Sequence, residues 1–132
     1  MTTSSSIITS TLLLNLTPHN IMVYPPDTNN IILYPRGGTV ARLRTDKQQQ
    51  LTSLEDGTPV YTPQHFSGIV PENNPTTSTT NIGVIVSMPV AEWLADSCAW
   101  QTQVYVADTG PDGAIRNEDG IIIGTKRLNR YK

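Results

Sequence analysis

Short segments in which apolar and polar residues alternate dominate the hydrophobic pattern of the chain. In the segment 12–17, Leu12, Leu14 and Leu16 recur at every second position, which is the spacing of one face of a β-strand. Similar segments follow at 21–24, 31–35 and 40–45, separated by turns rich in Pro, Gly and Asn. The first third of the chain is therefore predicted to form a series of short strands.

The second half contains the most apolar run and the best helical pattern. The run IGVIVSM at 82–88 predicts a central strand buried on both faces. Pro89 suits the first turn of a helix over about 89–98, and Val90, Trp93 and Leu94 have helical spacing. A further strand is predicted before Asp108. A hairpin is predicted around the Asp-Gly pair at 119–120.

Together these segments predict seven or eight strands and one short helix. We expect a mainly β fold, a small antiparallel barrel or sandwich that the helix closes on one side. The Ser/Thr-rich residues 1–10 are expected to be a disordered leader, and 11–132 a single domain. The polar segment 46–57 shows weak helical character, and 71–80 is expected to be a mobile, low-complexity loop.

The charge and cysteine content of the chain limit the classes of partner and compartment that we expect for this domain. The 132-residue chain has a net charge of −2, so no global positive field attracts nucleic acid or an anionic membrane. The basic tail KRLNRYK at 126–132 leaves nucleic-acid binding as a minor alternative. Cys98 is the only cysteine, which excludes an intramolecular disulfide and fits a small packing residue. The segment 1–14 lacks the charge pattern of a signal peptide, so we expect a cytoplasmic protein without membrane association.

The sequence VADTG at 106–110 resembles the active-site loop of aspartic proteases. Only ten residues separate Gly110 from Ile121, the start of a later apolar motif, and this is too short to build a substrate cleft. A Pro-Asp-Gly turn also follows at 111–113. We therefore interpret Asp108 and its neighbours as turn residues.

Other chemistry is weakly supported. His19 and His65 are the only histidines and have no neighbours at metal-ligand spacing, so no metal or cofactor is expected. The chain has no G-x-S-x-G elbow and no phosphate-binding loop. An anion could bind a backbone nest at 36–38 together with Arg42 and Arg44, although a hairpin turn with a solvated arginine face explains the same residues.

Four segments together resemble a family of small, mostly uncharacterised bacterial and phage proteins: NLTPHN (15–20), PRGGTVARL (35–43), VIVSMPVA (84–91) and RNEDGIIIGTKRL (116–128). The resemblance spans about 12–128. Family members often carry an acidic residue after the histidine, where this chain has Asn20. The resemblance implies a polar lining without an established activity, formed by Thr17, His19, Arg42, Ser87 and Arg116.

Three functions remain open at this stage. The favoured hypothesis is a non-enzymatic protein that binds a small anionic ligand, such as a signalling nucleotide sequestered by a phage counter-defence protein. The alternative is a structural or protein-interaction module, in which exposed strand edges serve assembly, including a homo-oligomer. The third is a small hydrolase that acts through His19 with an acidic partner such as Asp108. The residues do not decide whether the protein is an enzyme, and they favour a binding protein.

Overall fold

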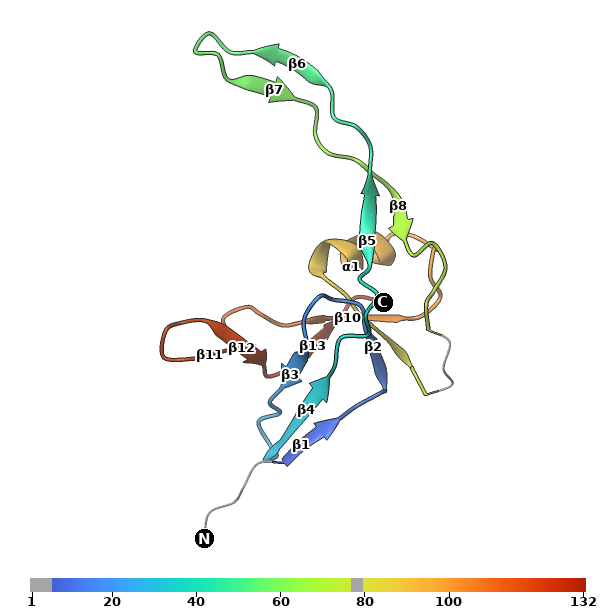
Figure 1. Ribbon diagram of the computed structural model, residues 1–132, viewed down its shortest axis with the longest axis vertical. Helices are drawn as coiled ribbons and strands as arrows, with labels where there is room; N and C mark the ends of the chain where they lie inside the picture. Colours follow the sequence, from blue (N-terminus) through green and yellow to red (C-terminus); the bar gives the residue numbers. More distant parts are fainter. Residues whose placement is uncertain (1–5, 77–79) are drawn as a thin grey trace.

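The computed structural model describes residues 6–76 and 80–132, and most of its strands belong to two sheets (Figure 1). The larger sheet has the strand order β1-β4-β3-β12-β11. Its members are β1 (Ser6–Thr9), β3 (Ile21–Val23), β4 (Asn30–Tyr34), β11 (Ala114–Arg116) and β12 (Ile122–Thr125). Both β1 and β12 pair in parallel, with β4 and β3 respectively, whereas β3 and β4 form an antiparallel hairpin.

The second sheet has the order β13-β10-β9-β2 and carries the helix. Its members are β2 (Leu13–Asn15), β9 (Gly83–Ile85), β10 (Gln103–Ala107) and β13 (Leu128–Arg130). Helix α1 (Met88–Ala95) connects β9 to β10, which lie parallel in the sheet. This arrangement is a β-α-β unit, because parallel neighbours need a long connection that a helix supplies. Strand β2 pairs in parallel with the other side of β9.

The main core lies between this second sheet and α1. Trp100, Leu94 and Val84 are fully buried there, as is Val104 of β10. The indole Nε1 of Trp100 donates a 3.2 Å hydrogen bond to the carbonyl oxygen of Glu72, so its one polar atom is satisfied. Burial on both faces explains why β9 has an uninterrupted apolar sequence.

Residues 42–70 form a long two-stranded arm that extends away from the body (Figure 1). Its base is the antiparallel pair β5 (Arg42–Thr45) and β8 (Phe66–Val70), and its far end is the hairpin of β6 (Gln50–Ser53) and β7 (Pro59–Tyr61). Backbone hydrogen bonds from Asp46 to His65 and from Thr62 to Gln49 join the two pairs. The arm is therefore one continuous ribbon.

The predicted mainly β class with one short helix is confirmed, and the helix begins one residue before the predicted start. Over the described residues both larger sheets are open, which fits the sandwich-like alternative rather than a closed barrel. The expected antiparallel pairing holds for the hairpins, whereas β2, β9 and β10 are parallel. The sequence pattern shows short turns between consecutive strands, which favours antiparallel pairing. It does not show which strands far apart in the chain pair with each other.

Three local predictions are wrong. Residues 6–9 of the expected disordered leader form β1, an exposed edge strand, while 1–5 lie outside the described residues. The weakly helical segment 46–57 contains β6, because pairing with β7 overrides its helical propensity. Cys98 is exposed rather than packed. Part of the expected mobile loop, residues 77–79, also lies outside the described residues.

The described part of the chain contains no helix with the length and apolar character needed to cross a membrane.

Candidate functional site

The parallel strands β2, β9 and β10 end at the same edge of their sheet. Their register aligns Asn15 with Ile85 and Ile85 with Tyr105. The residues that follow each strand therefore lie close together in space, although they are far apart in sequence. Ligands of open sheets with parallel strands commonly bind outside these carboxyl ends.

A surface cavity of about 490 Å³ lies at this edge. Its lining combines polar side chains with an apolar floor: Thr17, His19, Ser87, Asp108, Thr109, Asn129 and Tyr131, with Ile21, Val86, Met88, Val106, Ala107 and Gly110. The volume lies within the range of small-ligand sites. Of the five residues expected to form a polar lining, the structure brings together Thr17, His19 and Ser87.

Buried Asn15 shapes the corner that carries Thr17 and His19. Its Nδ2 donates hydrogen bonds to the carbonyl oxygens of His19 (2.7 Å) and Tyr34 (2.9 Å). Its Oδ1 accepts from the backbone N–H of Thr17 at 3.0 Å and lies 2.7 Å from the Thr17 hydroxyl. That hydroxyl also lies 3.0 Å from the carbonyl oxygen of His19 and can donate to only one of the two acceptors. The Thr17 side chain thus mainly stabilises the turn 16–19 and is not free to bind a ligand.

His19 and Ser87 are free to contact a ligand. Within the described ranges, neither side chain has a hydrogen-bond partner, and both residues are exposed at the cavity. Ser87 precedes α1 with an extended backbone (φ −69°, ψ 157°), yet its hydroxyl makes no capping bond with the helix. Its carbonyl oxygen accepts the first-turn hydrogen bond from Ala91 at 3.0 Å. The Ser87 hydroxyl therefore remains available at the mouth of the cavity.

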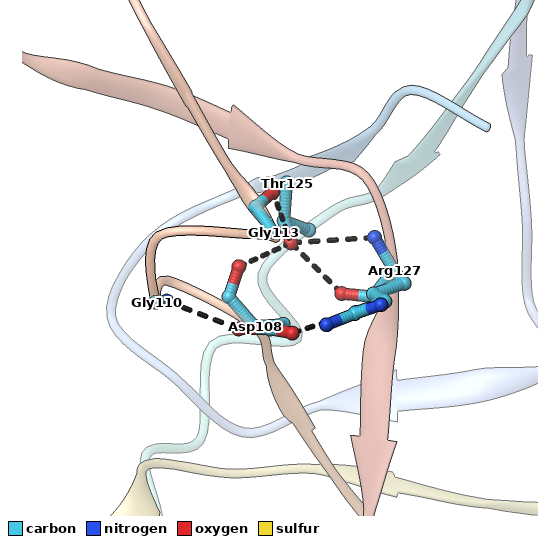
Figure 2. A network of polar contacts seen from close by, with 5 residues as sticks. All are labelled: Asp108, Gly110, Gly113, Thr125 and Arg127. Carbon is cyan, nitrogen blue, oxygen red and sulfur yellow. Dashed lines mark hydrogen bonds and ion pairs between the residues drawn. The ribbon is translucent and has the colours of Figure 1, made fainter. Parts of the chain in front are cut away.

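Asp108, another residue of the cavity lining, is the centre of a closed polar network (Figure 2). Arg127 Nε donates to Asp108 Oδ2 at 2.7 Å, and the Gly110 N–H donates to Oδ1 at 3.0 Å. The buried Thr125 hydroxyl lies 2.6 Å from the carbonyl oxygen of Asp108 and 2.8 Å from that of Arg127. A side chain at Gly113 would overlap the Asp108 carboxyl group. The hydrogen bonds of Asp108 thus stabilise the turn after β10.

This network also sets the ionisation of Asp108. The hydrogen bond from Arg127, followed by the one from the Gly110 N–H, lowers the pKa of the Asp108 carboxyl group below its ordinary value. A carboxylate held in this state is poorly suited to act as a general acid or to share a proton with a second carboxyl group. The interpretation of the VADTG segment as turn residues agrees with this geometry, and the pairing of Asp108 with His19 in a hydrolase gains no support.

Arg42 and Arg116 lie elsewhere. Arg42 is exposed on β5 at the base of the arm, where it pairs with Val70. Arg116 lies on β11 and donates a 2.6 Å hydrogen bond from Nη1 to the carbonyl oxygen of Gly120, within its own hairpin. The structure therefore does not bring these two arginines together with His19 at the cavity.

The backbone nest expected at 36–38 is largely occupied by the protein itself. The Arg36 N–H donates to Asn20 Oδ1 at 2.9 Å, and the Gly37 N–H donates to the carbonyl oxygen of Asn15 at 3.0 Å. Gly38 has a φ of +89°, which explains the glycine by the turn alone. A second surface hollow lies beside this turn and Pro18.

Sequence reasoning missed Asn15, Thr109 and Tyr131. Asn15 is only 1% exposed, although the alternation placed it on the polar face of its strand. An Asn followed two residues later by Thr is a local signal for a side chain that bonds its own backbone. Thr109 and Tyr131 carry no such signal, because they reach the cavity only through the pairing of β10 with β13.

Within residues 6–76 and 80–132, no three His, Cys, Asp or Glu side chains gather as ligands of a metal ion would. No protein-family model, curated protein or solved structure matches the chain. The resemblance of its short motifs to bacterial and phage proteins therefore stays a prediction.

Proposed function

We propose that the protein is a non-enzymatic binding protein whose small ligand occupies the cavity at the ends of β2, β9 and β10. The observation that supports this most is that His19 and Ser87 lie 68 positions apart in the chain yet line one cavity with unpaired polar side chains. The lining offers hydrogen-bonding groups without a nucleophile that is hydrogen-bonded to a base, which favours binding over turnover.

The chemistry of the lining narrows the ligand. Ile21, Val86 and Met88 provide apolar surface, while His19, Ser87 and Thr109 provide hydrogen bonds. This combination suits a small molecule with a flat apolar part and a polar or anionic group, as a nucleotide has. Sequestration of a signalling nucleotide is the specific form of this proposal. Because the two arginines lie elsewhere, the contacts that the lining offers the anionic group are hydrogen bonds from His19, Ser87 and Thr109.

Isothermal titration calorimetry against nucleosides and linear and cyclic nucleotides tests the proposal. We expect His19→Ala and Ser87→Ala each to weaken binding by about tenfold, the effect of losing one hydrogen bond to a polar ligand. Arg116→Ala is the matched control, because Arg116 lies on β11, and should leave affinity unchanged. Chromatography of the recovered ligand should show it chemically intact. Absence of heat across the panel, or equal losses in all three variants, would contradict the proposal.

A second function, that of a protein-interaction module, is favoured by the arm. Leu51 is 66% exposed and Leu54 is 54% exposed at its far end. Exposed apolar side chains on an unpaired strand edge are typical of surfaces that another chain covers. Retention of partner proteins by the immobilised chain tests this function, with the arm-tip variant Leu51→Ser/Leu54→Ser as the comparison. We expect that variant to lose the partner while keeping its ligand affinity.

A further inference from the structure

The far hairpin of the arm lacks a core of its own. All four residues of β6 are exposed, and Tyr61 on β7 is 49% exposed. An isolated two-stranded hairpin is marginally stable in water, because neither face is covered. The far hairpin therefore gains stability when another surface covers it.

The two outer edges of the arm differ in their capacity to pair with another strand. The β7 edge contains Pro59 and Pro63, which lack the N–H group that a strand ladder requires. The β6 edge, from 42 to 56, contains no proline. Only the β6 edge therefore has a backbone N–H at every position, with register shifts at Arg44/Thr45 and Gln50/Thr52.

The arm also carries opposite charges at its two ends. Glu55 and Asp56 are exposed at the tip, in a turn where the Thr58 N–H donates to Asp56 at 2.9 Å. Arg42 and Arg44 are exposed at the base and share one face of β5, because Leu43 between them packs on the core. Lys47 follows them along the same edge. At about 3.3 Å per residue, tip and base are roughly 40 Å apart.

We propose that two copies of this chain pair through their arms, antiparallel along the β6 edges, about a two-fold axis near Gln49. This inference rests on the second proposed function, since it names the partner of the arm. Counted along the sequence, an axis at Gln49 brings the acidic turn with Asp56 of one copy to the level of Arg42 of the second copy, and Leu54 to the level of the aliphatic stem of Arg44. No two like charges then face each other. A parallel pairing would instead bring the two acidic tips together.

The residues at the proposed axis suit a two-fold contact. Identical residues meet there, and Gln48, Gln49 and Gln50 carry no charge. The backbone N–H of Gln49 donates to the Thr62 hydroxyl at 2.9 Å, and its carbonyl oxygen accepts from the Thr62 N–H at 2.8 Å, so this position is already held against the other strand of the arm. A two-fold contact uses the same surface on both copies and closes on itself, which gives a dimer rather than a filament.

Sedimentation equilibrium with charge-reversed variants tests the inference. The wild-type chain should show twice the chain mass of 14.5 kDa. Glu55→Arg/Asp56→Arg and Arg42→Glu/Arg44→Glu should each weaken dimerisation at least about tenfold, because like charges then face each other. An equimolar mixture of the two variants should recover the dimer, since the acidic arm of one pairs with the basic arm of the other. Added salt should weaken the wild-type dimer.

A cysteine placed on the axis gives a second measurement. In a Cys98→Ser background, which removes the exposed native thiol, Gln49→Cys should form an intermolecular disulfide on mild oxidation. The matched control is Glu118→Cys in the exposed turn between β11 and β12, which should remain unlinked.

The inference fails if the wild type remains a monomer at every concentration, or if a dimer forms that neither charge reversal weakens. In that case, loss of a retained partner protein by the Glu55→Arg/Asp56→Arg variant would keep the interaction function and exclude the second copy as its partner. If that variant also keeps every partner, both proposals fail. The ligand-binding proposal is independent of these outcomes because it depends on His19 and Ser87.

Discussion

Asn15 Nδ2 donates a 2.7 Å hydrogen bond to the carbonyl oxygen of His19, so the buried end of β2 fixes the corner from which His19 reaches the cavity. The TPH turn is therefore not an independent loop. Its conformation depends on a side chain that is 1% exposed and lies four residues earlier in the chain. The same amide also binds the carbonyl oxygen of Tyr34, which connects the corner to β4 of the other sheet.

Replacement of Asn15 by Ala should destabilise the protein by about 3 kcal/mol, because the carbonyl oxygens of His19 and Tyr34 and the Thr17 N–H lose their hydrogen bonds to the Asn15 amide. Urea denaturation followed by tryptophan fluorescence measures this loss. Asn20→Ala is the matched control, since it removes one exposed hydrogen bond from the Arg36 N–H. It should cost at most about 1 kcal/mol. Equal losses for the two variants would contradict the role assigned to Asn15.

Replacement of Lys132 by Met should release the carboxyl end of α1. The Lys132 ammonium group lies 2.6 Å from the carbonyl oxygen of Trp100, 3.2 Å from that of Ser97 and 3.4 Å from that of Leu94. A cation at this position stabilises the negative end of the helix dipole, so we expect a loss of about 1–2 kcal/mol.

Thermal unfolding monitored by circular dichroism checks the Lys132 prediction. Lys126→Met provides the comparison, because the side chain of Lys126 is exposed and only its backbone N–H is bonded, to Gly113. A melting temperature lowered as much in the Lys126 variant as in the Lys132 variant would show that loss of charge alone, and not the contact with the helix, causes the effect.

Replacement of Asp108 by Asn should lower stability in a pH-dependent way. The hydrogen bonds from Arg127 and Gly110 lower the pKa of the folded Asp108 below its value in the unfolded chain. The unfolded state then binds more protons as the solution becomes acidic, so the stabilisation is complete above about pH 5 and is lost as the pH falls below about 4. Melting temperatures from pH 2 to pH 7 should therefore converge for wild type and variant at the acid end. A difference that is constant over this range would exclude the ion pair as its cause.

Replacement of Gly113 by Ala should destabilise the turn after β10. An added Cβ would overlap the carboxyl group and the carbonyl oxygen of Asp108, both held in the network of Figure 2. We expect a loss of about 3 kcal/mol, the range for overpacking against atoms that cannot move. Gly68→Ala is the control, because its nearest neighbour would be the flexible Arg44 side chain at 3.7 Å. Urea unfolding should show a clearly lower free energy of unfolding for Gly113→Ala than for Gly68→Ala.

Local patterns in the sequence predicted several elements correctly. The Asp-Gly pair at 119–120 forms the expected turn between β11 and β12, with Gly120 at a φ of +79°. Pro89 lies in the first turn of α1, and the apolar run before it forms the fully buried β9. Each of these features depends on residues within a few positions of one another.

The candidate site was only partly predictable. The motif resemblance pointed to Thr17, His19 and Ser87, which do line one cavity, and also to Arg42 and Arg116, which lie elsewhere. The polar character of Asn15 predicts an exposed side chain. Its burial is explained only by its hydrogen-bond partners. Those partners include the Tyr34 carbonyl oxygen, which lies 19 positions away in the chain.

The sequence by itself determined the mainly β class, the turns and the position of the helix, because period-two alternation, proline and glycine act on the nearest residues. Only the tertiary structure decided that β2, β9 and β10 lie in parallel, that their ends enclose a cavity and that residues 42–70 leave the body as an arm. The physical reason is that strand pairing depends on the relative free energies of alternative contacts between segments far apart in the chain. A local sequence pattern does not show which of these segments pair.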